Sequence, residues 1–349
     1  MPTDLTARAM DWAESGHLPD AVLRLGIRRL LRQRLAELGA DQVQTAAHLQ
    51  REFHRSLRSA PLAPLAHKAN EQHYEVPADF FAAVLGPHRK YSACHWPSGV
   101  LTLADAEASA LAITCERARL ADGQQVLELG CGWGSLSLWM AERYPRSRIT
   151  ALSNSHSQRA HIEAEARRRG LGNLQVLTHD FNTFECPGRF DRVVSVEMFE
   201  HLRNWPQAFA RVAGWLETGG LFFLHVFVHG GAPYAFEERD ASDWMTRHFF
   251  SGGMMPGDDT ALTFQDDLRL IDRWRWDGTH YARTARAWLH NMDGARGALA
   301  PLFAATYGRD PAARWWQRWR MFFLAVQELF GFEGGQRWWV GHYLFQRRA

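Results

Sequence analysis

A glycine-rich loop, Glu128-Leu-Gly-Cys-Gly-Trp-Gly134, follows a short apolar run and precedes a helical pattern. Glycines at these positions allow a sharp turn and leave room for a ligand to approach the backbone. The apolar run, 125–129, has the length of a buried strand. The spacing GxGxG differs from the GxGxxG of dinucleotide-binding folds, and therefore disfavours a nicotinamide enzyme.

After residue 120 the chain alternates between short apolar runs and helical patterns. The runs predict strands at 125–129, 148–152, 174–177, 190–196 and 221–227, and the patterns between them predict helices at 135–143, 157–169 and 205–216. Strands separated by helices in this way pair in parallel, so the sequence predicts an α/β fold with an open, doubly wound sheet. Further helices at 283–292 and 311–330 and a closing strand at 338–345 follow.

The segment 1–64 differs from the rest of the chain because it shows only helical patterns. Residues 21–38 place apolar side chains on one stripe with arginines between them, a more polar helix follows at 41–57, and Pro61 and Pro64 interrupt the chain. We therefore predict a helical extension over 1–64. The α/β domain is predicted over 65–349, with a substrate-covering helical insertion at about 232–335.

Composition narrows the functional classes. Forty basic and 38 acidic residues give a net charge of +2, which does not favour nucleic acid as a partner. The absence of a secretory signal and of any apolar run long enough to cross a membrane predicts a cytoplasmic protein without an integral membrane segment. Four cysteines without a CxxC pair argue against a disulfide scaffold and a structural zinc site, and we expect no metal.

The strand–loop–helix pattern E-x-G-x-G-x-G resembles class I S-adenosylmethionine-dependent methyltransferases with a Rossmann-like sheet. The resemblance implies that Glu128 binds the amino-acid ammonium or orients the loop, and that Asp180 and Phe181 face the adenine. That class usually carries an acidic residue after the second strand, where this chain offers Asn154 and Gln158 to the ribose. The alternatives are a glycine turn that binds nothing and an Asn154 that is merely a polar surface residue.

An acidic cluster, Ser195-Val-Glu197-Met-Phe-Glu200-His201, follows the fourth predicted strand. If a helix begins at Glu197, then Glu200 and His201 lie on the same face as it. Two carboxylates and an imidazole in one cleft can attract a cation and take its proton, so these three residues are the catalytic candidates. The alternative is a helix cap followed by a solvated first turn.

Longer stretches extend the resemblance over residues 65–348. They are Asn70–Pro77, Lys90–Trp96, Val126–Gly134, Ala151–Ser155, Glu197–His201, Asp243–Pro256, Phe264–Asp267, His280–Tyr281, Ala287–Leu289 and Glu328–Gly331. The chain resembles the cyclopropane-fatty-acid synthase superfamily, and within it the coclaurine and pavine type N-methyltransferases. The resemblance implies cofactor contacts from Tyr91, Ser92, Gly130, Cys131, Gly132 and Ser195, and substrate contacts from Tyr74, Glu75, Trp96, His225, Phe227 and Tyr281.

Two positions distinguish the subfamilies. Where this chain has Glu197, the lipid synthases carry glycine. Where this chain has Ala93, they carry a cysteine that belongs to their bicarbonate site. In this chain a cysteine, Cys94, follows one position later. At the other bicarbonate-binding positions of the lipid synthases, this chain carries the same types of residue, namely Glu200, His225 and Tyr281.

We therefore predict an N-methyltransferase that uses S-adenosyl-L-methionine, yields S-adenosyl-L-homocysteine, and acts on a small aromatic, tetrahydroisoquinoline-like amine. A homodimer is one option for its assembly. The alternatives are a cyclopropane-fatty-acyl-phospholipid synthase or related lipid methyltransferase, a small-molecule O- or C-methyltransferase, and a cofactor-binding scaffold without catalysis.

Overall fold

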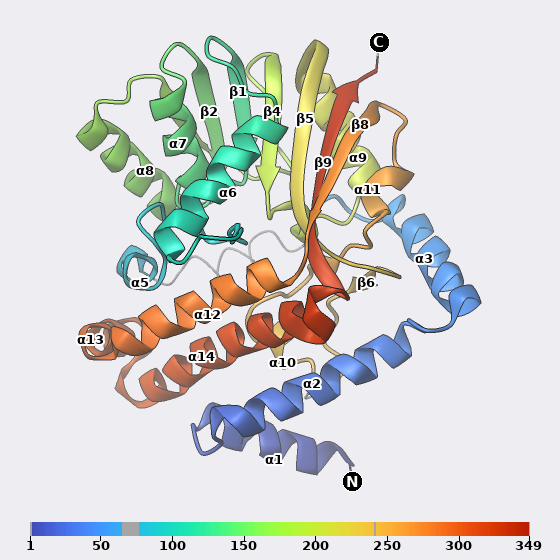
Figure 1. Cartoon of the computed structure of the whole chain (residues 1–349), viewed down its shortest axis with the longest axis vertical. Coiled ribbons are helices and arrows are strands. Elements are labelled where there is room, and N and C mark those ends of the chain that lie inside the picture. Colours follow the sequence, from blue (N-terminus) through green and yellow to red (C-terminus); the bar gives the residue numbers. More distant parts are fainter. Residues whose placement is uncertain (1, 65–76, 241, 349) are drawn as a thin grey trace.

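A seven-stranded sheet in the order β3-β2-β1-β4-β5-β9-β8 forms the centre of the computed structural model, which describes residues 2–64, 77–240 and 242–348 (Figure 1). The strands are β1 (Gln125–Leu129), β2 (Arg148–Ser153), β3 (Leu174–Thr178), β4 (Phe190–Val196), β5 (Leu216–His229), β8 (Leu268–Trp276) and β9 (Trp338–Arg347). The first five are parallel, and β9 is antiparallel to both of its neighbours. The predicted doubly wound α/β sheet is confirmed.

Helices cover both faces of the sheet. One face carries α6 (Leu103–Arg117), α7 (Ser135–Arg143) and α8 (His156–Arg169), and the other carries α9 (Trp205–Trp215). Successive side chains of β1 point to opposite faces of the sheet. Val126 packs under α6 and α7, whereas Leu127 packs under α9. Gly170 ends α8 in the left-handed conformation, which glycine adopts without the steric cost of a Cβ atom.

Strand β8 was not predicted from the sequence. Its residues, LRLIDRWRW, mix charged and large apolar side chains, and it is an edge strand paired only with β9. An edge strand keeps one side in solvent, so charges are tolerated there and the apolar run that marks a buried strand is missing. β8 lies within the segment 232–335, which is therefore not helical throughout.

A helical layer covers one end of the sheet. It contains α5 (Ala78–Val84), α10 (Trp244–His248), α12 (Thr279–Gly294), α13 (Arg296–Tyr307) and α14 (Arg309–Gly331), with the short α11 (Thr260–Thr263) beside the far edge of the sheet. The short strands β6 (Tyr234–Ala235) and β7 (Met254–Met255) pair with each other near α10. Tyr281 of α12 bonds to Glu197 at the end of β4, so this layer covers the carboxyl ends of the strands.

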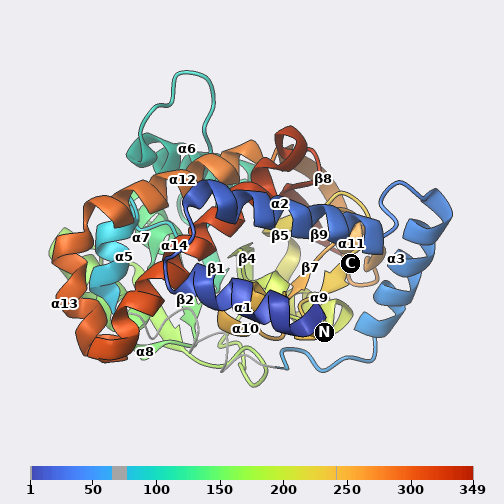
Figure 2. The same ribbon diagram turned by 90° about the horizontal axis from the view of Figure 1, so that it is seen from below.

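The N-terminal helices are α1 (Pro2–Glu14), α2 (Asp20–Glu37) and α3 (Val43–Leu57). Seen from below, α1 and α2 lie across the outer side of α14 (Figure 2). Arg24 and Arg28 of α2 form ion pairs with Glu328 of α14. The extension thus packs on the covering layer, and the domain boundary at residue 64 stays a prediction.

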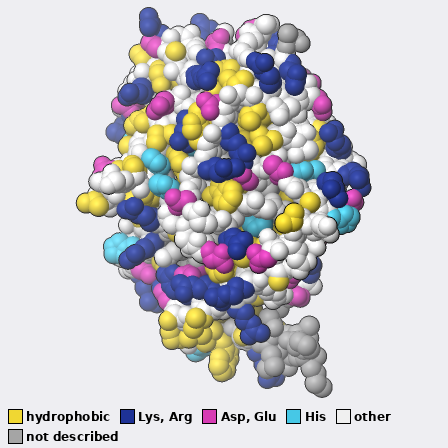
Figure 3. Space-filling model, turned by 45° about the vertical axis from the view of Figure 1, so that its right-hand side comes forward, with side chains coloured by type: hydrophobic (Ala, Val, Ile, Leu, Met, Phe, Trp, Pro, Cys, Tyr) yellow, Lys and Arg dark blue, Asp and Glu magenta, His cyan; other side chains and the backbone are white. Residues whose placement is uncertain are grey.

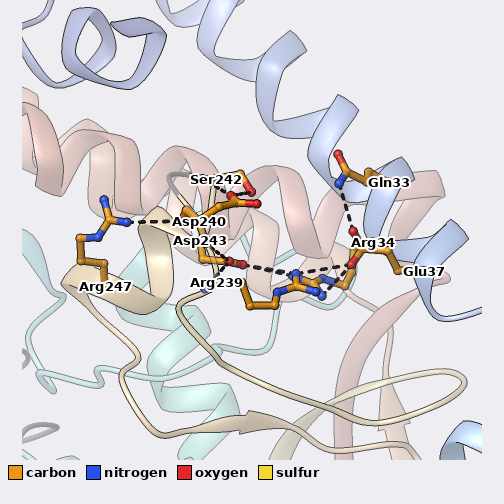
Figure 4. Close-up of polar contacts among 8 residues, drawn as sticks. All are labelled: Gln33, Arg34, Glu37, Arg239, Asp240, Ser242, Asp243 and Arg247. Atoms are coloured by element: carbon orange, nitrogen blue, oxygen red, sulfur yellow. Dashed lines mark hydrogen bonds and ion pairs between the residues drawn. The ribbon is translucent and has the colours of Figure 1, made fainter. Parts of the chain in front are cut away.

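Polar contacts also join α2 to the segment that leads into α10. Arg34 of α2 and Arg239 both point toward Asp243, and each guanidinium lies 3.5 Å from a carboxylate oxygen of that residue (Figure 4). Asp243 also accepts the backbone N–H of Arg239 at 2.9 Å. The start of α10 is therefore tied to the N-terminal extension.

The surface shown in Figure 3 carries basic and acidic side chains intermixed. None of the helices in the described ranges combines the length and apolar character that crossing a membrane requires.

Glu14 has a buried carboxylate, only 8% exposed, whose contribution to stability can be tested. It accepts hydrogen bonds from Trp244 and His248 of α10 and from Arg318 of α14. Burial raises its pKa, but the bonds with His248 and Arg318 lower it more, so the pKa lies well below its usual value of 4.5. We expect Glu14→Gln to lower the free energy of unfolding by about 3 kcal/mol at pH 7.

A group with a depressed folded-state pKa stabilises the protein above its unfolded pKa, and this contribution is lost as pH falls. The difference between wild type and Glu14→Gln in denaturant unfolding should therefore shrink below pH 4.5. Glu52→Gln is the matched control, because Glu52 pairs with Arg55 on the surface of α3 at 49% exposure. It should change stability by less than about 1 kcal/mol. Equal losses of unfolding free energy in both variants would contradict the stabilising role assigned to the buried carboxylate of Glu14.

Candidate active site

The glycine loop after β1 contains three left-handed residues with different surroundings. A Cβ atom at Gly130 would come within 2.7 Å of the Met198 side chain, and one at Gly134 within 2.6 Å of Ile162. A Cβ atom at Gly132, where φ is +50°, would meet no atom within 4 Å. The fold itself requires the first and third glycines, whereas the second faces open space.

That open space is a cavity between the glycine loop, α6 and the segment before it. Its lining comprises Arg89, Lys90, Tyr91, Ser92, Leu111, Thr114, Glu128, Gly130, Cys131, Gly132, Trp133, Ser135, Leu136, Val196 and Glu197. Six of the predicted cofactor residues line it: Tyr91, Ser92, Glu128, Gly130, Cys131 and Gly132. The structure thus brings together two segments that lie far apart in the sequence.

Glu128 is the buried acidic group of this cavity. Burial raises its pKa to about 8, and the hydroxyl of Ser137 donates a hydrogen bond to its carboxylate. A buried carboxyl with a raised pKa is stabilised in its ionised form when a cation binds beside it. Glu128 can therefore hold a ligand ammonium, which fits the predicted role.

The other five predicted cofactor residues do not line the cavity. Asn154 is exposed after β2, and the buried Gln158 accepts a hydrogen bond from Ser153 at 2.7 Å. The Ser195 hydroxyl donates to the carbonyl of Leu129 at 3.2 Å, and it thus joins β4 to β1.

The remaining two residues follow β3. Asp180 is exposed and accepts the backbone N–H of Asn182 at 2.8 Å. The Phe181 ring packs on Trp215, with centroids 5.8 Å apart, and under the guanidinium of Arg211. Cofactor contacts from Asn154, Gln158, Asp180, Phe181 and Ser195 stay predictions.

Glu197 occupies the turn after β4 in a left-handed conformation, with φ of +48°. The condition that a helix begins at this residue is not met, because a short 3-10 turn, η1 (Phe199–His201), follows instead of an α-helix. Three donors hold its carboxylate: the backbone N–H of Ala93 at 2.8 Å, the Tyr281 hydroxyl at 2.7 Å and the His225 imidazole at 3.2 Å.

The two carboxylates of the cluster have pKa values displaced in opposite directions. Burial raises the pKa of Glu197, but the bond from His225 and the charge of Lys90 lower it below its ordinary value. Burial and then repulsion from Glu197 raise the pKa of Glu200 well above its ordinary value. Opposite shifts of this kind mark one group as the anion and the other as the proton carrier.

Glu200 and His201 differ from Glu197 in their state of protonation. Glu200 is 2% exposed, and its Oε2 atom has no hydrogen-bond partner among the described residues. Burial lowers the pKa of His201 to about 4, so its imidazole is neutral at pH 7. A protonated Glu200 can give up a proton and a neutral His201 can accept one, whereas the ionised Glu197 is held by its three hydrogen bonds.

Aromatic rings lie on one side of this cluster. Phe250 stacks on the His201 ring with centroids 6.2 Å apart, and Phe227 contacts both Phe250 and Phe330. Tyr281 stacks on Phe330 at 4.4 Å. Sequence reasoning did not single out Phe250 and Phe330, although both lie in stretches that carry the family resemblance, because a lone phenylalanine is more often a core residue.

Two of the predicted substrate residues, Phe227 and Tyr281, thus lie among these rings, and His225 contacts Glu197. Trp96 packs in a separate small cluster, where its indole N–H donates to Thr284 at 2.9 Å. Tyr74 and Glu75 lie outside the described residues. The roles of all six stay predictions. In the described part of the chain, no three His, Cys, Asp or Glu side chains are grouped so as to hold a metal ion.

Similarity to known proteins identifies the family of this chain. A family model described as mycolic acid cyclopropane synthetase matches residues 64–330. The (S)-coclaurine N-methyltransferase of Thalictrum flavum subsp. glaucum is 36% identical over 341 residues, covering 96% of this chain and 94% of that protein. The cyclopropane-fatty-acyl-phospholipid synthase of Escherichia coli (strain K12) is 28% identical over 241 residues, which cover 68% of this chain and 60% of that protein.

Among solved structures, a coclaurine N-methyltransferase bound to N-methylheliamine and SAH superposes with a TM-score of 0.92 and 32% identity. The match covers 99% of this chain and all of that one. The predicted resemblance is therefore confirmed, and the chain belongs to the mycolic acid cyclopropane synthetase family of S-adenosylmethionine-dependent methyltransferases.

Proposed function

We propose that this enzyme transfers the methyl group of S-adenosylmethionine to the nitrogen of a small aromatic amine. The observation that carries the proposal is Glu197, an acidic residue held in a left-handed backbone conformation at the edge of the cofactor cavity. For a non-glycine residue this conformation costs about 1–3 kcal/mol, and it persists where the surroundings and the function of the residue require it. The lipid synthases that the sequence resembles carry glycine here, which adopts that conformation without strain.

The bonds of Glu197 argue against bicarbonate at this site. In the lipid enzymes His225 and Tyr281 correspond to bicarbonate-binding positions, but here both donate to the carboxylate of Glu197. The backbone N–H of Ala93, which stands where those enzymes have a cysteine, donates to it as well. A carboxylate of the protein thus occupies donors that an external bicarbonate would need.

The cavity beside β1 fits S-adenosylmethionine. The space in front of Gly132 accommodates a close ligand, and the buried carboxyl of Glu128 can pair with the ammonium of the amino acid. When bound there, the cofactor supplies an activated methyl group on a sulfonium sulfur.

The protein must deliver the amine without its extra proton, because a protonated amine has no lone pair to accept a methyl group. The ionised Glu197 attracts the ammonium form. His201 then takes the proton, and the charge of Glu197 stabilises the resulting imidazolium. Glu200 can take it only after losing its own proton, which the arriving cation favours by offsetting the repulsion from Glu197. Low exposure around the cluster also favours the neutral amine.

The rings beside His201 suit an aromatic substrate. Phe227, Phe250, Phe330 and Tyr281 form a continuous set of aromatic contacts next to the acidic cluster. Such rings can stack on an aromatic amine and attract its positive charge through cation–π contacts. The similarity to coclaurine N-methyltransferases over almost the whole chain supports the same substrate class.

Replacing Gly132 tests the cofactor cavity. We expect Gly132→Ala to weaken S-adenosylmethionine binding at least tenfold in isothermal titration calorimetry, because the added Cβ enters the space of the ligand. Gly170→Ala is the matched control: its φ is +70° and its Cβ would also meet no atom within 4 Å, but it lies at the end of α8. Both variants carry the backbone strain, so equal affinities would refute the assignment of the loop.

If His201 and Glu200 take part in removing the proton of the amine, the turnover of their variants should depend on pH. His201→Ala and Glu200→Gln should each lower kcat by about 10²-fold at pH 7 while the affinity for S-adenosylmethionine changes little. The loss should shrink toward pH 9, where more amine arrives neutral. Turnover of labelled S-adenosylmethionine between pH 6 and 9 measures this. Wild-type turnover in both variants across that range would show that the two side chains are structural.

Glu197 tests the substrate class. Glu197→Gln keeps the shape but removes the charge, so a cationic amine should bind about 5- to 30-fold more weakly, equivalent to ~1–2 kcal/mol. Glu163→Gln, on the exposed side of α8, is the control and should leave binding unchanged. Added bicarbonate should not change the wild-type rate. If the wild-type enzyme instead consumes unsaturated phospholipid vesicles with bicarbonate stimulation and methylates none of the amines offered, it is a lipid enzyme.

A further inference from the structure

A line of polar side chains runs from Glu197 through two strands to α6. The His225 Nε2 atom lies 3.2 Å from Glu197 Oε1, and its Nδ1 atom lies 2.9 Å from His342 Nε2. The His342 Nδ1 atom lies 2.6 Å from a terminal nitrogen of Arg117, the last residue of α6. The two histidines are directly opposite each other on β5 and β9. The members of this line lie far apart along the chain, so no local pattern in the sequence indicates it.

The chemistry of the two end groups fixes the direction of every hydrogen bond in the line. A guanidinium can only donate, so His342 must accept at Nδ1 and carry its proton on Nε2. His342 therefore donates to Nδ1 of His225, which carries its own proton on Nε2 and donates it to Glu197. An ionised carboxylate can only accept, which agrees with this direction at the other end.

Burial leaves these rings without alternative partners. Both imidazoles are fully buried, and within the described residues each ring bonds only to its two neighbours in the line. Trp276 of β8 packs edge-on against both, with ring centroids 4.4 Å from His342 and 5.5 Å from His225. Neither ring can turn over without breaking two hydrogen bonds in a dry environment.

Both histidines are neutral, because burial and the surrounding cations disfavour a second proton. Burial lowers the pKa of His225 to about 4, and Lys90 and Arg117 oppose its protonation further, although Glu197 favours it. Burial also lowers the pKa of His342 well below its ordinary value, with His225, Arg117, Lys90 and His95 as the charges that act in the same direction. A neutral ring carries one proton, so each has a single tautomer.

We propose that Arg117 and His342 are positioning residues that fix His225 as an N–H donor to Glu197 and thereby keep Glu197 ionised at the methyl-transfer site. Without the guanidinium, His342 can carry its proton on Nδ1 and accept at Nε2. His225 would then donate from Nδ1 and present a lone pair to the carboxylate, which repels the anion. The role of an ionised Glu197 in amine binding rests on the proposed function, whereas the tautomers do not.

The tautomers can be measured in the substrate-free enzyme. Nitrogen-15 NMR of histidine-labelled protein distinguishes Nε2–H from Nδ1–H rings and from imidazolium, and His225→Gln and His342→Gln assign the signals. Carbon-13 NMR of glutamate-labelled protein reports the titration of Glu197, assigned with Glu197→Gln. We expect both rings in the Nε2–H form between pH 6 and 9. An Nδ1–H or imidazolium form of His225 in the wild type would overturn the proposal.

Arg117→Met removes the donor but keeps an apolar stem against Trp274 and Trp276. We expect a mixture of histidine tautomers and a rise of about one pH unit in the midpoint of the Glu197 titration. Arg117→Lys keeps a donor and should restore the wild-type spectrum. Arg192→Met is the control, because Arg192 is also half-buried but donates to the backbone carbonyls of Arg119 and Asp191 and not to a histidine. Wild-type tautomers and titration in folded Arg117→Met would also overturn the proposal.

Kinetics then separate this proposal from the proposed function. The acid limb of kcat/KM for the amine should move to higher pH by the same one unit in Arg117→Met, about tenfold in rate on that limb, with little change in kcat at its plateau. A merely structural role would not shift the pH profile. If the wild type methylates no amine, the proposed function fails, while the two NMR readouts still decide whether the line controls Glu197.

Discussion

The carboxylate of Glu197 and its three hydrogen bonds connect the parts of this structure on which its chemistry depends. Ala93 belongs to the segment that lines the cofactor cavity, His225 to the centre of the sheet, and Tyr281 to the helical layer above the strand ends. One side chain therefore joins the segment beside the glycine-loop cavity, the sheet and the covering helices. These bonds offset the cost of a left-handed backbone at Glu197.

The same bonds determine how charge is distributed in the site. Glu197 is held as an anion, and its charge together with burial keeps the neighbouring Glu200 protonated before substrate arrives. With His201 neutral, the cluster carries one negative charge, which matches a single ammonium. In the proposed reaction, arrival of that cation offsets the repulsion between the carboxylates, so Glu200 can release its own proton and then accept the proton of the amine. Binding of the amine and its deprotonation would thus share one electrostatic cause.

The N-terminal helices act on this site from a distance. Glu14 and Arg34 bind α10 at Trp244, His248 and Asp243, and α10 is followed by Phe250, which stacks on His201. The extension therefore fixes the segment that supplies one aromatic side of the site.

The sequence by itself determined the α/β fold, the bounds of those strands and helices that show clear apolar periodicity, and the position of the glycine loop, because glycine turns and apolar periodicity are local properties. It also placed the acidic cluster at a strand end. Only the tertiary structure decided that Glu197 turns left-handed instead of starting a helix, that β8 joins the sheet, and that Phe250 and Phe330 lie beside His201. The line from Arg117 through His342 and His225 likewise exists only in the folded chain. These features depend on contacts between residues far apart in the sequence. Their conformations are stabilised by the residues they contact in the fold and not by their neighbours along the chain.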